Sequence, residues 1–353
     1  MKYPHLENIP AKINLDSGIV SGLTKAHGLL GELKGTAQTI PSEDILINTL
    51  PLLESKSSSE IEQIITTHDD IFVSNDDKSL SSQAKEVQTY AKALQMGCKE
   101  VQEKGFISVN LLINIANMIN SNDAGVRKQA GTSLKNEKGD VVYMPPQNYD
   151  DIIKYMFKLE SFINADDSYD PLIKMAMIHY YFETIHPFYD GNGRVGRILN
   201  ILYLIKEDVL YSPILYLSGS IINDKANYYK TINNVTQKDD WSEYVLYILT
   251  SMVKSCYAEL IAIYNIKILM DEVKEKIKSD SPRIYSHEFL NTLFIHPYVK
   301  TEYIENNVGV TRQTASKYLK KMVKIGILEL VKRGNINYYV NRELINIFKN
   351  IKY

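Results

Sequence analysis

The stretch PLIKMAMIHYYFETIHPFYDGNGRVGRILNILYLIK, residues 171–206, has two apolar segments separated by a charged one. Residues 171–185 are almost entirely apolar or aromatic, which is typical of a helix that is enclosed on most sides. The residues after Arg197 have the same character. Because two buried helices would flank it, the charged segment HPFYDGNGRVGR (186–197) is expected to lie at the edge of the core.

Helical periodicity also dominates the rest of the chain. Residues 17–35 place their apolar side chains on one stripe, and the last of them, a glycine, is suited to end that helix. Pro51 interrupts the next helical pattern and predicts two helices, the second of which holds Ser58 and Glu62. Around residues 141–143 the pattern changes, because Lys-Gly and Pro-Pro pairs flank the β-prone sequence VVY. We therefore predict a mainly α fold from which one short hairpin protrudes.

Charge is distributed unevenly along the 353 residues. From residue 282 onward there are 12 Lys and Arg against 5 Asp and Glu, whereas the preceding residues carry 28 against 37. A separate basic unit that can meet polyanions is indicated at this end. The length predicts two or three domains at about 150 residues each, and we expect them at residues 1–85, 86–280 and 281–353.

Neither cysteines nor apolar runs point to export or to a membrane. Cys98 and Cys256 have no CxxC spacing and are expected to be buried free thiols. The first residues lack the apolar region of a signal peptide, and no run approaches about 18 consecutive apolar residues. We expect a cytoplasmic protein without a membrane span.

The charged segment contains the parts of an anion site. Gly191, Asn192 and Gly193 allow a tight turn with unobstructed backbone N–H groups, and the helix that begins near Arg194 adds the positive end of its dipole. Arg194 and Arg197 lie three residues apart on one side of that helix, and guanidinium groups match the geometry of phosphate. The segment is expected to bind several phosphates.

Two further side chains suggest chemistry on those phosphates. Asp190 beside bound phosphates is explained by a bridging Mg²⁺ ion, which binds one or two carboxylates together with phosphate oxygens. His186 is the side chain best suited to accept a proton from a hydroxyl near neutral pH. Each part alone has an ordinary alternative: a helix end before proline, a plain turn, or a solvated arginine pair. Together they indicate transfer of a phosphate-linked group from a nucleotide to an alcohol.

The order of these residues matches the pattern HPFxxGNGRxxR, with an acid before the first glycine, and the chain resembles the Fic family. The resemblance implies transfer of AMP from Mg-ATP to a Ser, Thr or Tyr hydroxyl of a target protein. It implies that His186 deprotonates the hydroxyl, that Asp190 holds Mg²⁺, and that Phe188 anchors the loop in the core. The residues implied to bind the phosphates of ATP are Gly191, Asn192, Gly193, Arg194 and Arg197.

The hairpin resembles the flap of that family, which adds a strand to the backbone of the target. An ordinary surface hairpin is the alternative reading. Tyr228 and Tyr229 are candidates for a wall against the adenine ring, although tyrosine pairs in helices are more often core residues. The flap residues are Val141, Val142, Tyr143 and Met144.

Ser58 and Glu62 are four residues apart and would project from one face of their helix. They resemble the inhibitory helix of the family, whose glutamate pairs with the second arginine of the motif, here Arg197. A carboxylate at that arginine would exclude the γ-phosphate. Gln63 stands where the family has Gly or Asn. Gln favours continuing the helix. This departure from the family pattern puts the pose of Glu62 and the strength of inhibition in question. The alternative is that Glu62 is a solvated helix charge.

The basic unit reads as a helix, a turn at residues 308–309, a second helix and two β-prone runs around the turn KRGN, and it resembles a winged helix. DNA binding through residues 300–340 is possible on this pattern, and docking to a protein is the alternative. Residues at the start of the second helix would contact bases or phosphates: Thr311, Arg312, Gln313, Thr314 and Lys317.

The leading interpretation is an autoinhibited protein adenylyltransferase that uses ATP and Mg²⁺. The second interpretation is a transcriptional regulator whose nucleotide site senses rather than catalyses, which the intact His186 disfavours. The resemblance leaves open a homodimer, transfer of another phosphate-linked group, and removal of AMP.

Overall fold

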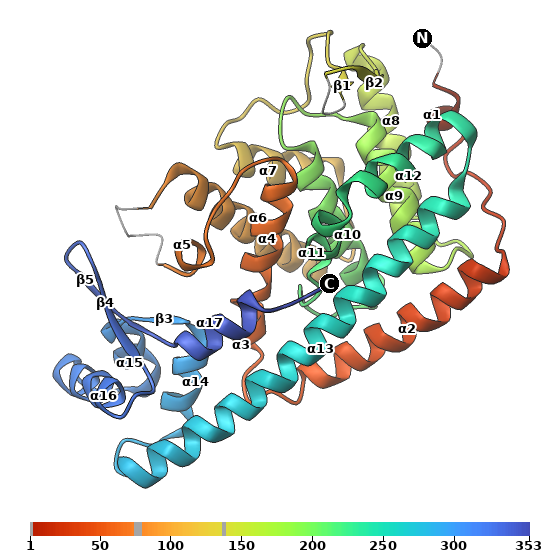
Figure 1. The fold of residues 1–353 in the computed structure, drawn as a ribbon. Coiled ribbons are helices and arrows are strands. Elements are labelled where there is room, and N and C mark those ends of the chain that lie inside the picture. Colours follow the sequence, from red (N-terminus) through yellow and green to blue (C-terminus); the bar gives the residue numbers. More distant parts are fainter. Residues whose placement is uncertain (1–2, 74–79, 136–138) are drawn as a thin grey trace.

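The computed structural model describes residues 3–73, 80–135 and 139–353, and the two helices around the charged segment lie at its centre (Figure 1). Nearly every residue of α9 (Pro171–Ile185) and of α10 (Asn192–Lys206) is buried. The two helices pack against each other. The near absence of polar residues in the two segments predicted that both helices would be enclosed.

Other helices surround this pair. On the N-terminal side, α6 and α7 pack against α10, and α8 packs against α9. After α10 the chain forms α11 and α12 before a long final helix of the body. The bounds are α1 (Pro4–Glu7), α3 (Asp44–Ile47), α4 (Leu50–Ile61), α5 (His68–Phe72), α6 (Ser82–Lys104), α7 (Val109–Asn120), α8 (Tyr149–Ile163), α11 (Leu217–Asn223) and α12 (Lys225–Lys238).

Two long helices run side by side along one flank of the body (Figure 1). They are α2 (Ser17–Ala37), which continues two residues past the predicted end at Gly35, and α13 (Trp241–Asp280). By length and composition α13 could cross a membrane, but 61% of its most apolar window is buried inside the protein. Most of its apolar residues pack inside the protein, whereas others such as Ile261 and Tyr264 are exposed. Cys98 and Cys256 are buried free thiols, as predicted.

The predicted hairpin is present and protrudes from the helical body. It consists of β1 (Leu134–Lys135) and β2 (Val141–Tyr143), which pair antiparallel with Leu134 opposite Tyr143. The residues that connect the strands include 136–138, which lie outside the described parts of the chain. The mainly helical fold class with a small hairpin is thereby confirmed.

The basic unit follows α13. A three-stranded antiparallel sheet in the order β3-β5-β4 lies with three helices, and the last helix returns to pack on α13. The order of elements agrees with the helix-turn-helix and hairpin expected of a winged helix. The bounds are α14 (His287–Ile295), β3 (Tyr298–Val299), α15 (Thr301–Val308), α16 (Arg312–Lys324), β4 (Glu329–Arg333), β5 (Ile336–Val340) and α17 (Arg342–Lys349).

Candidate functional site

The charged segment forms a closed loop between α9 and α10. The helix α9 ends at His186, whose φ of 50° is left-handed, and the loop turns again at Gly191, whose φ is 78°. Phe188 is 1% exposed and packs against Phe182 with ring centroids 6.1 Å apart. The buried ring fixes the middle of the loop in the core, as the family resemblance implied.

The Asn192 side chain closes the loop. Its Oδ1 accepts a hydrogen bond from the Phe188 N–H at 2.8 Å, and its Nδ2 donates to the Phe188 carbonyl at 2.9 Å. The side chain is buried and both of its polar atoms are used in these contacts. That Asn192 binds phosphate stays a prediction, for which its backbone N–H in the first turn of α10 is the available donor.

Arg127 also holds the loop, and sequence reasoning missed it. The side chain is fully buried; its Nε donates to the His186 carbonyl at 2.8 Å, and its backbone N–H donates to the Pro187 carbonyl at 2.9 Å. A terminal nitrogen of the same guanidinium donates to the carbonyl of Pro146, at the base of the flap. One side chain thus ties the base-bearing loop to the flap. Arg127 lies 59 residues before His186, and no local pattern marks it.

His186 is partly buried at the end of α9. Burial lowers the pKa of the imidazole from 6.5 to about 4. The ring is consequently neutral at physiological pH, which is the form that can accept a proton. The sequence alone suggested an ordinary value near 6.5, because burial of the ring is a property of the fold.

Asp190 lies at the open side of the loop. Its side chain is 80% exposed, and Oδ1 accepts a hydrogen bond from the Gly191 N–H at 2.7 Å. The Asn120 side chain, also missed, donates to the Asp190 carbonyl at 2.9 Å. Within the described residues no three His, Cys, Asp or Glu side chains cluster as metal ligands. One accessible carboxylate beside a phosphate-binding turn fits Mg²⁺ that takes its remaining ligands from phosphates and water.

The two motif arginines are both buried and both paired with carboxylates. Arg194, 1% exposed, forms an ion pair with Glu86 of α6 and lies 3.5 Å from Asp190 Oδ2. Arg197, 2% exposed, is paired with Glu62. Glu86 is the partner that sequence reasoning missed, because it lies 108 residues from Arg194 within an otherwise ordinary amphipathic helix.

The Arg197 guanidinium makes three contacts with residues 58–62, which we call the inhibitory segment after the family helix that they resemble. It donates to the Ser58 hydroxyl at 2.7 Å, to the Ser58 carbonyl at 2.8 Å and to Glu62 Oε1 at 2.8 Å. Burial acts to raise the pKa of Glu62, but the charge and hydrogen bond of Arg197, together with the charges of Arg194 and Lys225, outweigh burial and the pKa is lowered. The same Oε1 occupies the space where a Cβ on Gly193 would lie. The carboxylate therefore sits directly on the turn that is expected to bind phosphate.

The end of α4 differs from the prediction. The helix stops at Ile61, Glu62 is its C-cap, and Gln63 adopts a left-handed φ of 65°. Gln63 was expected to continue the helix; its weak intrinsic preference is overridden by tertiary contacts such as that of Lys225, whose Nζ donates to the Ile61 carbonyl at 2.6 Å. A left-handed residue at this point is the conformation that Gly or Asn adopts most easily.

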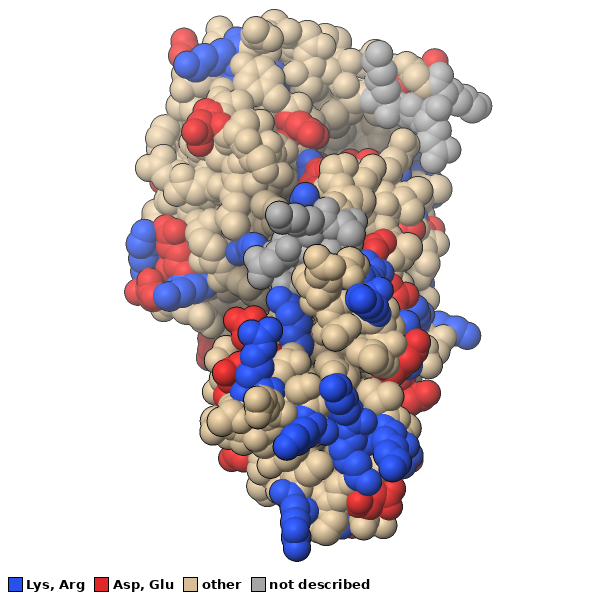
Figure 2. All heavy atoms as spheres, turned by 90° about the vertical axis from the view of Figure 1, so that its left-hand side faces the viewer, with Lys and Arg blue, Asp and Glu red and all other residues tan. Residues whose placement is uncertain are grey.

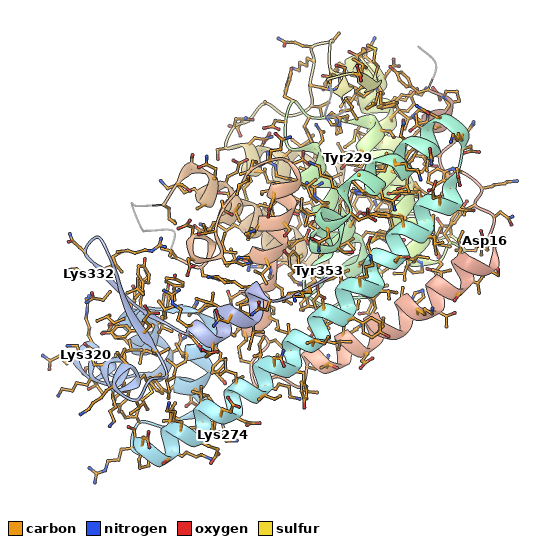
Figure 3. The ribbon with its side chains drawn as sticks, viewed as in Figure 1. Asp16, Tyr229, Lys274, Lys320, Lys332 and Tyr353 are labelled. Atoms are coloured by element: carbon orange, nitrogen blue, oxygen red, sulfur yellow. The ribbon has the colours of Figure 1, made fainter. Side chains whose placement is uncertain are left out.

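The tyrosine pair separates into a core residue and a surface residue. Tyr228 is 1% exposed, and its hydroxyl makes a 2.5 Å hydrogen bond with His179. Tyr229, labelled in Figure 3, is 45% exposed and lies 5.1 Å from Tyr228 between ring centroids. The suggestion of a two-residue adenine wall is corrected accordingly, since only Tyr229 is accessible for stacking.

The flap residues divide in the same way. Val141, Val142 and Met144 are 53%, 42% and 39% exposed, whereas Tyr143 is partly buried and hydrogen-bonds His5 at 3.1 Å. Three of the four predicted flap side chains are therefore presented to solvent.

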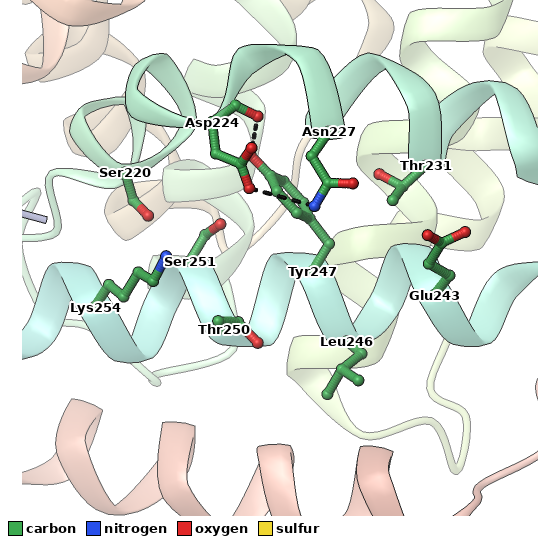
Figure 4. Close-up of a pocket in the computed structure, with 10 residues that line it drawn as sticks. All are labelled: Ser220, Asp224, Asn227, Thr231, Glu243, Leu246, Tyr247, Thr250, Ser251 and Lys254. Carbon is green, nitrogen blue, oxygen red and sulfur yellow. Dashed lines mark hydrogen bonds between the residues drawn. The ribbon is translucent and has the colours of Figure 1, made fainter.

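A shallow pocket lies away from the motif, between α11, α12 and α13 (Figure 4). Its volume is about 240 Å³, and it is lined by polar side chains such as Asp224, Asn227 and Lys254. Asp224 accepts hydrogen bonds from Asn227 at 3.2 Å and, through its carbonyl, from Tyr247 at 3.3 Å. None of the predicted site residues lines it.

Cations of the basic unit gather on the face drawn in Figure 2. Figure 2 shows Lys and Arg side chains gathered over the lower half of the molecule, and Lys320 of α16 and Lys332 of β4 are labelled in Figure 3. Among the predicted contacts, Arg312, Gln313 and Lys317 are exposed. The Thr311 hydroxyl accepts from the Thr314 N–H at 3.3 Å and so caps α16.

Three family models match the chain. They are the Fic/DOC family N-terminal model over residues 20–99, the Fic/DOC family model over 106–204, and the C-terminal domain of SoFic-like protein adenylyltransferases over 269–344. The second of these contains the loop and both helices that flank it, apart from the last turn of α10.

Curated relatives match shorter stretches. A protein adenylyltransferase Fic of Culex quinquefasciatus is 36% identical over 72 residues, 20% of this chain and 14% of the relative. A probable protein adenylyltransferase of Aquifex aeolicus is 35% identical over 69 residues, 19% of this chain and 21% of the relative. The matched stretch thus spans about a fifth or less of each relative.

Solved structures share the fold. A Fic family protein from Desulfovibrio desulfuricans superposes with a TM-score of 0.60 at 18% identity and covers 93% of this chain and 97% of its own. A Fic domain-containing signalling protein from Bacteroides thetaiotaomicron superposes with a TM-score of 0.55 at 19% identity and covers 70% and 97%. The complete HPFxxGNGRxxR motif, its position between two buried helices and the matching models lead to one conclusion: the chain belongs to the Fic/DOC family.

Proposed function

We propose that the protein is a protein adenylyltransferase that transfers AMP from ATP to a hydroxyl side chain of a target protein. One observation carries the proposal: a partly buried, neutral His186 lies at one end of a loop whose other end leads into a helix with two buried arginines. The relatives named protein adenylyltransferase support the same reaction.

In the proposed reaction His186 accepts the hydroxyl proton while the hydroxyl oxygen forms a bond to the α-phosphorus. The bond from that phosphorus to the bridging oxygen breaks, and pyrophosphate leaves with its electron pair. Asp190 would hold Mg²⁺, which would neutralise phosphate charge. The backbone N–H groups at the start of α10, Arg194 and Arg197 would bind the phosphates, so that positioning and charge neutralisation supply most of the rate.

The exposed flap would align the target. Val141 and Val142 lie on β2 at the edge of a two-stranded hairpin, and both side chains are exposed. An extended segment of the target can add to such an edge through backbone hydrogen bonds, with little demand on its sequence. Arg127 links this hairpin to the His186 loop, so a bound segment would be held at a fixed position relative to the base.

We further propose that residues 58–62 inhibit this activity. Glu62 uses the Arg197 contact that a γ-phosphate would need, and its Oε1 occupies the Gly193 turn. Holding productive binding near one per cent requires a bias of about 2.8 kcal/mol, which a partly buried charge-assisted pair can supply.

The test is labelling of a cell lysate by wild type and Glu62→Gly with ATP labelled at either the α- or the γ-phosphate. AMP transfer predicts label in protein from α-labelled ATP only, and stronger labelling by Glu62→Gly. Label from the γ-position would mean phosphorylation, and no label from either position would rule out the proposed transfer.

A second candidate function is binding of duplex DNA through the basic unit. The exposed cations of α16 favour it: Arg312, Lys317, Lys320 and Lys324. Phosphate contacts make such affinity fall steeply with salt. A gel shift that weakens between low and physiological salt would support this function, and no binding to any duplex at low salt would make the unit a docking module.

A further inference from the structure

The chain directly after the inhibitory segment is bound by the basic unit. Helix α5 begins six residues after Glu62, and its Asp69 carboxylate accepts hydrogen bonds from the Tyr298 hydroxyl at 2.6 Å, Arg342 at 2.7 Å and Lys349 at 2.9 Å. Burial alone would raise the pKa of Asp69, but these hydrogen bonds lower it to about 2. Two cations and a hydroxyl of the basic unit thus converge on one carboxylate.

Two further contacts join the same surfaces. Arg333, at the end of β4, pairs with Asp70 at 3.1 Å, and Phe348 of α17 stacks on Phe72 with ring centroids 5.7 Å apart. We call this set of contacts the α5 interface. Its members are Asp69, Asp70 and Phe72 on α5, with Tyr298, Arg333, Arg342, Phe348 and Lys349 on the basic unit.

Only a short stretch of chain connects the α5 interface to Glu62. Four residues separate Glu62 from Thr67, which caps α5, and an extended chain spans at most about 3.5 Å per residue. On its other side Glu62 is fixed by α4 and by the contact of Lys225 with the Ile61 carbonyl. The connection between Glu62 and Thr67 is therefore too short to absorb a shift of α5 by several ångströms. Such a shift moves Glu62.

The cations of the α5 interface are also suited to another anion. Arg333 is 26% exposed at its side chain, and Arg342 and Lys349 are each 37% exposed, so solvent reaches all three. Arg333 belongs to the β4–β5 hairpin beside the exposed Lys332 (Figure 3), on the same basic unit as α16. Phosphates of a duplex that contacted this hairpin would compete with Asp69 and Asp70 for the same guanidinium groups.

We propose that the α5 interface couples the basic unit to the inhibitory segment: duplex DNA bound at the β4–β5 hairpin displaces Asp69 and Asp70, and the released α5 withdraws Glu62 from Arg197. The inference rests on the proposed inhibition by Glu62. Coupling of this kind is reciprocal, so loss of the interface raises transferase activity and DNA affinity together.

The first test measures auto-labelling with α-labelled ATP for Asp69→Asn/Asp70→Asn in two backgrounds. With Glu62 present we expect an increase of about fivefold or more; in Glu62→Gly the double substitution should change nothing, because no inhibition is left to release. Asp271→Asn, which breaks the Asp271–Lys274 pair of 3.3 Å on α13, is the matched control and should leave labelling unchanged.

Two results would overturn the coupling. One is unchanged labelling by the double variant; the other is an equal increase in both backgrounds, which would mean an effect outside inhibition. If Glu62→Gly itself fails to label, the proposed transferase is wrong instead, so the two failures are distinguishable. Melting curves of each variant identify any that simply fail to fold.

A charge exchange sharpens the first test. Arg333→Asp should activate like the double variant, and adding Asp70→Arg should restore low labelling by re-forming the pair in reverse. Failure of the exchange to restore inhibition, with both variants folded, would count against Arg333 as a coupling residue.

The second test adds a duplex of about 25 base pairs at low salt to the full chain. We expect labelling by wild type to rise when the duplex is added, and Asp69→Asn/Asp70→Asn to bind the duplex more tightly than wild type does. A duplex that fails to bind, or that binds both proteins equally and leaves labelling unchanged, would overturn DNA as the displacing ligand.

Discussion

The loop at residues 186–197 and the inhibitory segment meet at Arg197, but they are held by different kinds of contact. The loop is fixed by the buried ring of Phe188 and by buried hydrogen bonds from Asn192 and Arg127. Glu62 lies just past a helix end, with 34% of its side chain exposed, and is held by an ion pair. The loop is thus fixed in the core, whereas the partly exposed Glu62 carboxylate can move without disturbing the core.

The largest expected effect comes from removing His186, the proposed base, from the rigid loop. His186→Ala in the Glu62→Gly background should lower kcat of labelling by about 10²- to 10⁴-fold, because the proposed general base is lost. Binding of Mg-ATP, measured by calorimetry, should persist since the phosphate contacts are intact. Substantial labelling by the variant would show that His186 is not the base.

Breaking the apolar anchor should cost stability and not only activity. Phe188→Ala removes a side chain that is 1% exposed and should lower the free energy of unfolding by about 3–5 kcal/mol. Urea denaturation measures the change. A loss below about 1 kcal/mol would mean that the loop is not anchored by the core, and the contrast with the inhibitory segment would fail.

In the inhibitory segment, Glu62→Gly should raise labelling by roughly 10- to 100-fold. This is equivalent to losing a bias of about 1.4–2.8 kcal/mol against productive ATP binding. Its stability should change much less than that of Phe188→Ala. Ser58→Ala, which removes the 2.7 Å contact to Arg197 and keeps the carboxylate, is the matched control and should activate less. Equal labelling by wild type and Glu62→Gly would remove inhibition from this segment.

A smaller effect is expected at Gln63, the residue after Glu62. Gln63 has a left-handed φ of 65°, which costs a non-glycine residue about 1 kcal/mol. Gln63→Gly should relieve that cost, favour the inhibitory conformation and lower basal labelling by up to about fivefold. Gln63→Val, which tolerates this conformation poorly, should shift labelling in the opposite direction.

The smallest effect is expected from pH. Because burial lowers the pKa of His186 to about 4, the imidazole is already neutral at higher pH, and kcat/KM of Glu62→Gly should show no inflection between about pH 5.5 and 8. Activity is lost only as the pH falls toward 4 and the ring becomes protonated. An inflection near 6.5 would mean that His186 is solvated in the working enzyme.

The fold class and the loop could be predicted because their signals are local. Period and composition mark α9 and α10, and the motif residues lie within twelve positions. The contact of Glu62 with Arg197, 135 residues apart, came from resemblance to a family and not from the chain's own pattern. Arg127, Asn120 and Glu86 were missed since each acts through a partner at least 59 residues away.

Other predictions failed where packing outweighed local preference. Helix propensity favoured a helical Gln63, but it is worth only tenths of a kilocalorie per mole and the chain turns there. Tyr228 and Tyr229 are adjacent in sequence, yet only the fold decides which ring is enclosed. The α5 interface left no trace in the sequence, because its acids and cations are ordinary surface residues until the basic unit folds back.

The short connection between Glu62 and Thr67 has a consequence for how this protein can vary. The length of this connection, and not its side chains alone, sets the spacing between two fixed points. Two inserted glycines would leave the Arg197 contacts and the α5 interface both formed while decoupling one from the other. A change in loop length alone could therefore uncouple the basic unit from the inhibitory segment during evolution, while each of them keeps its own contacts.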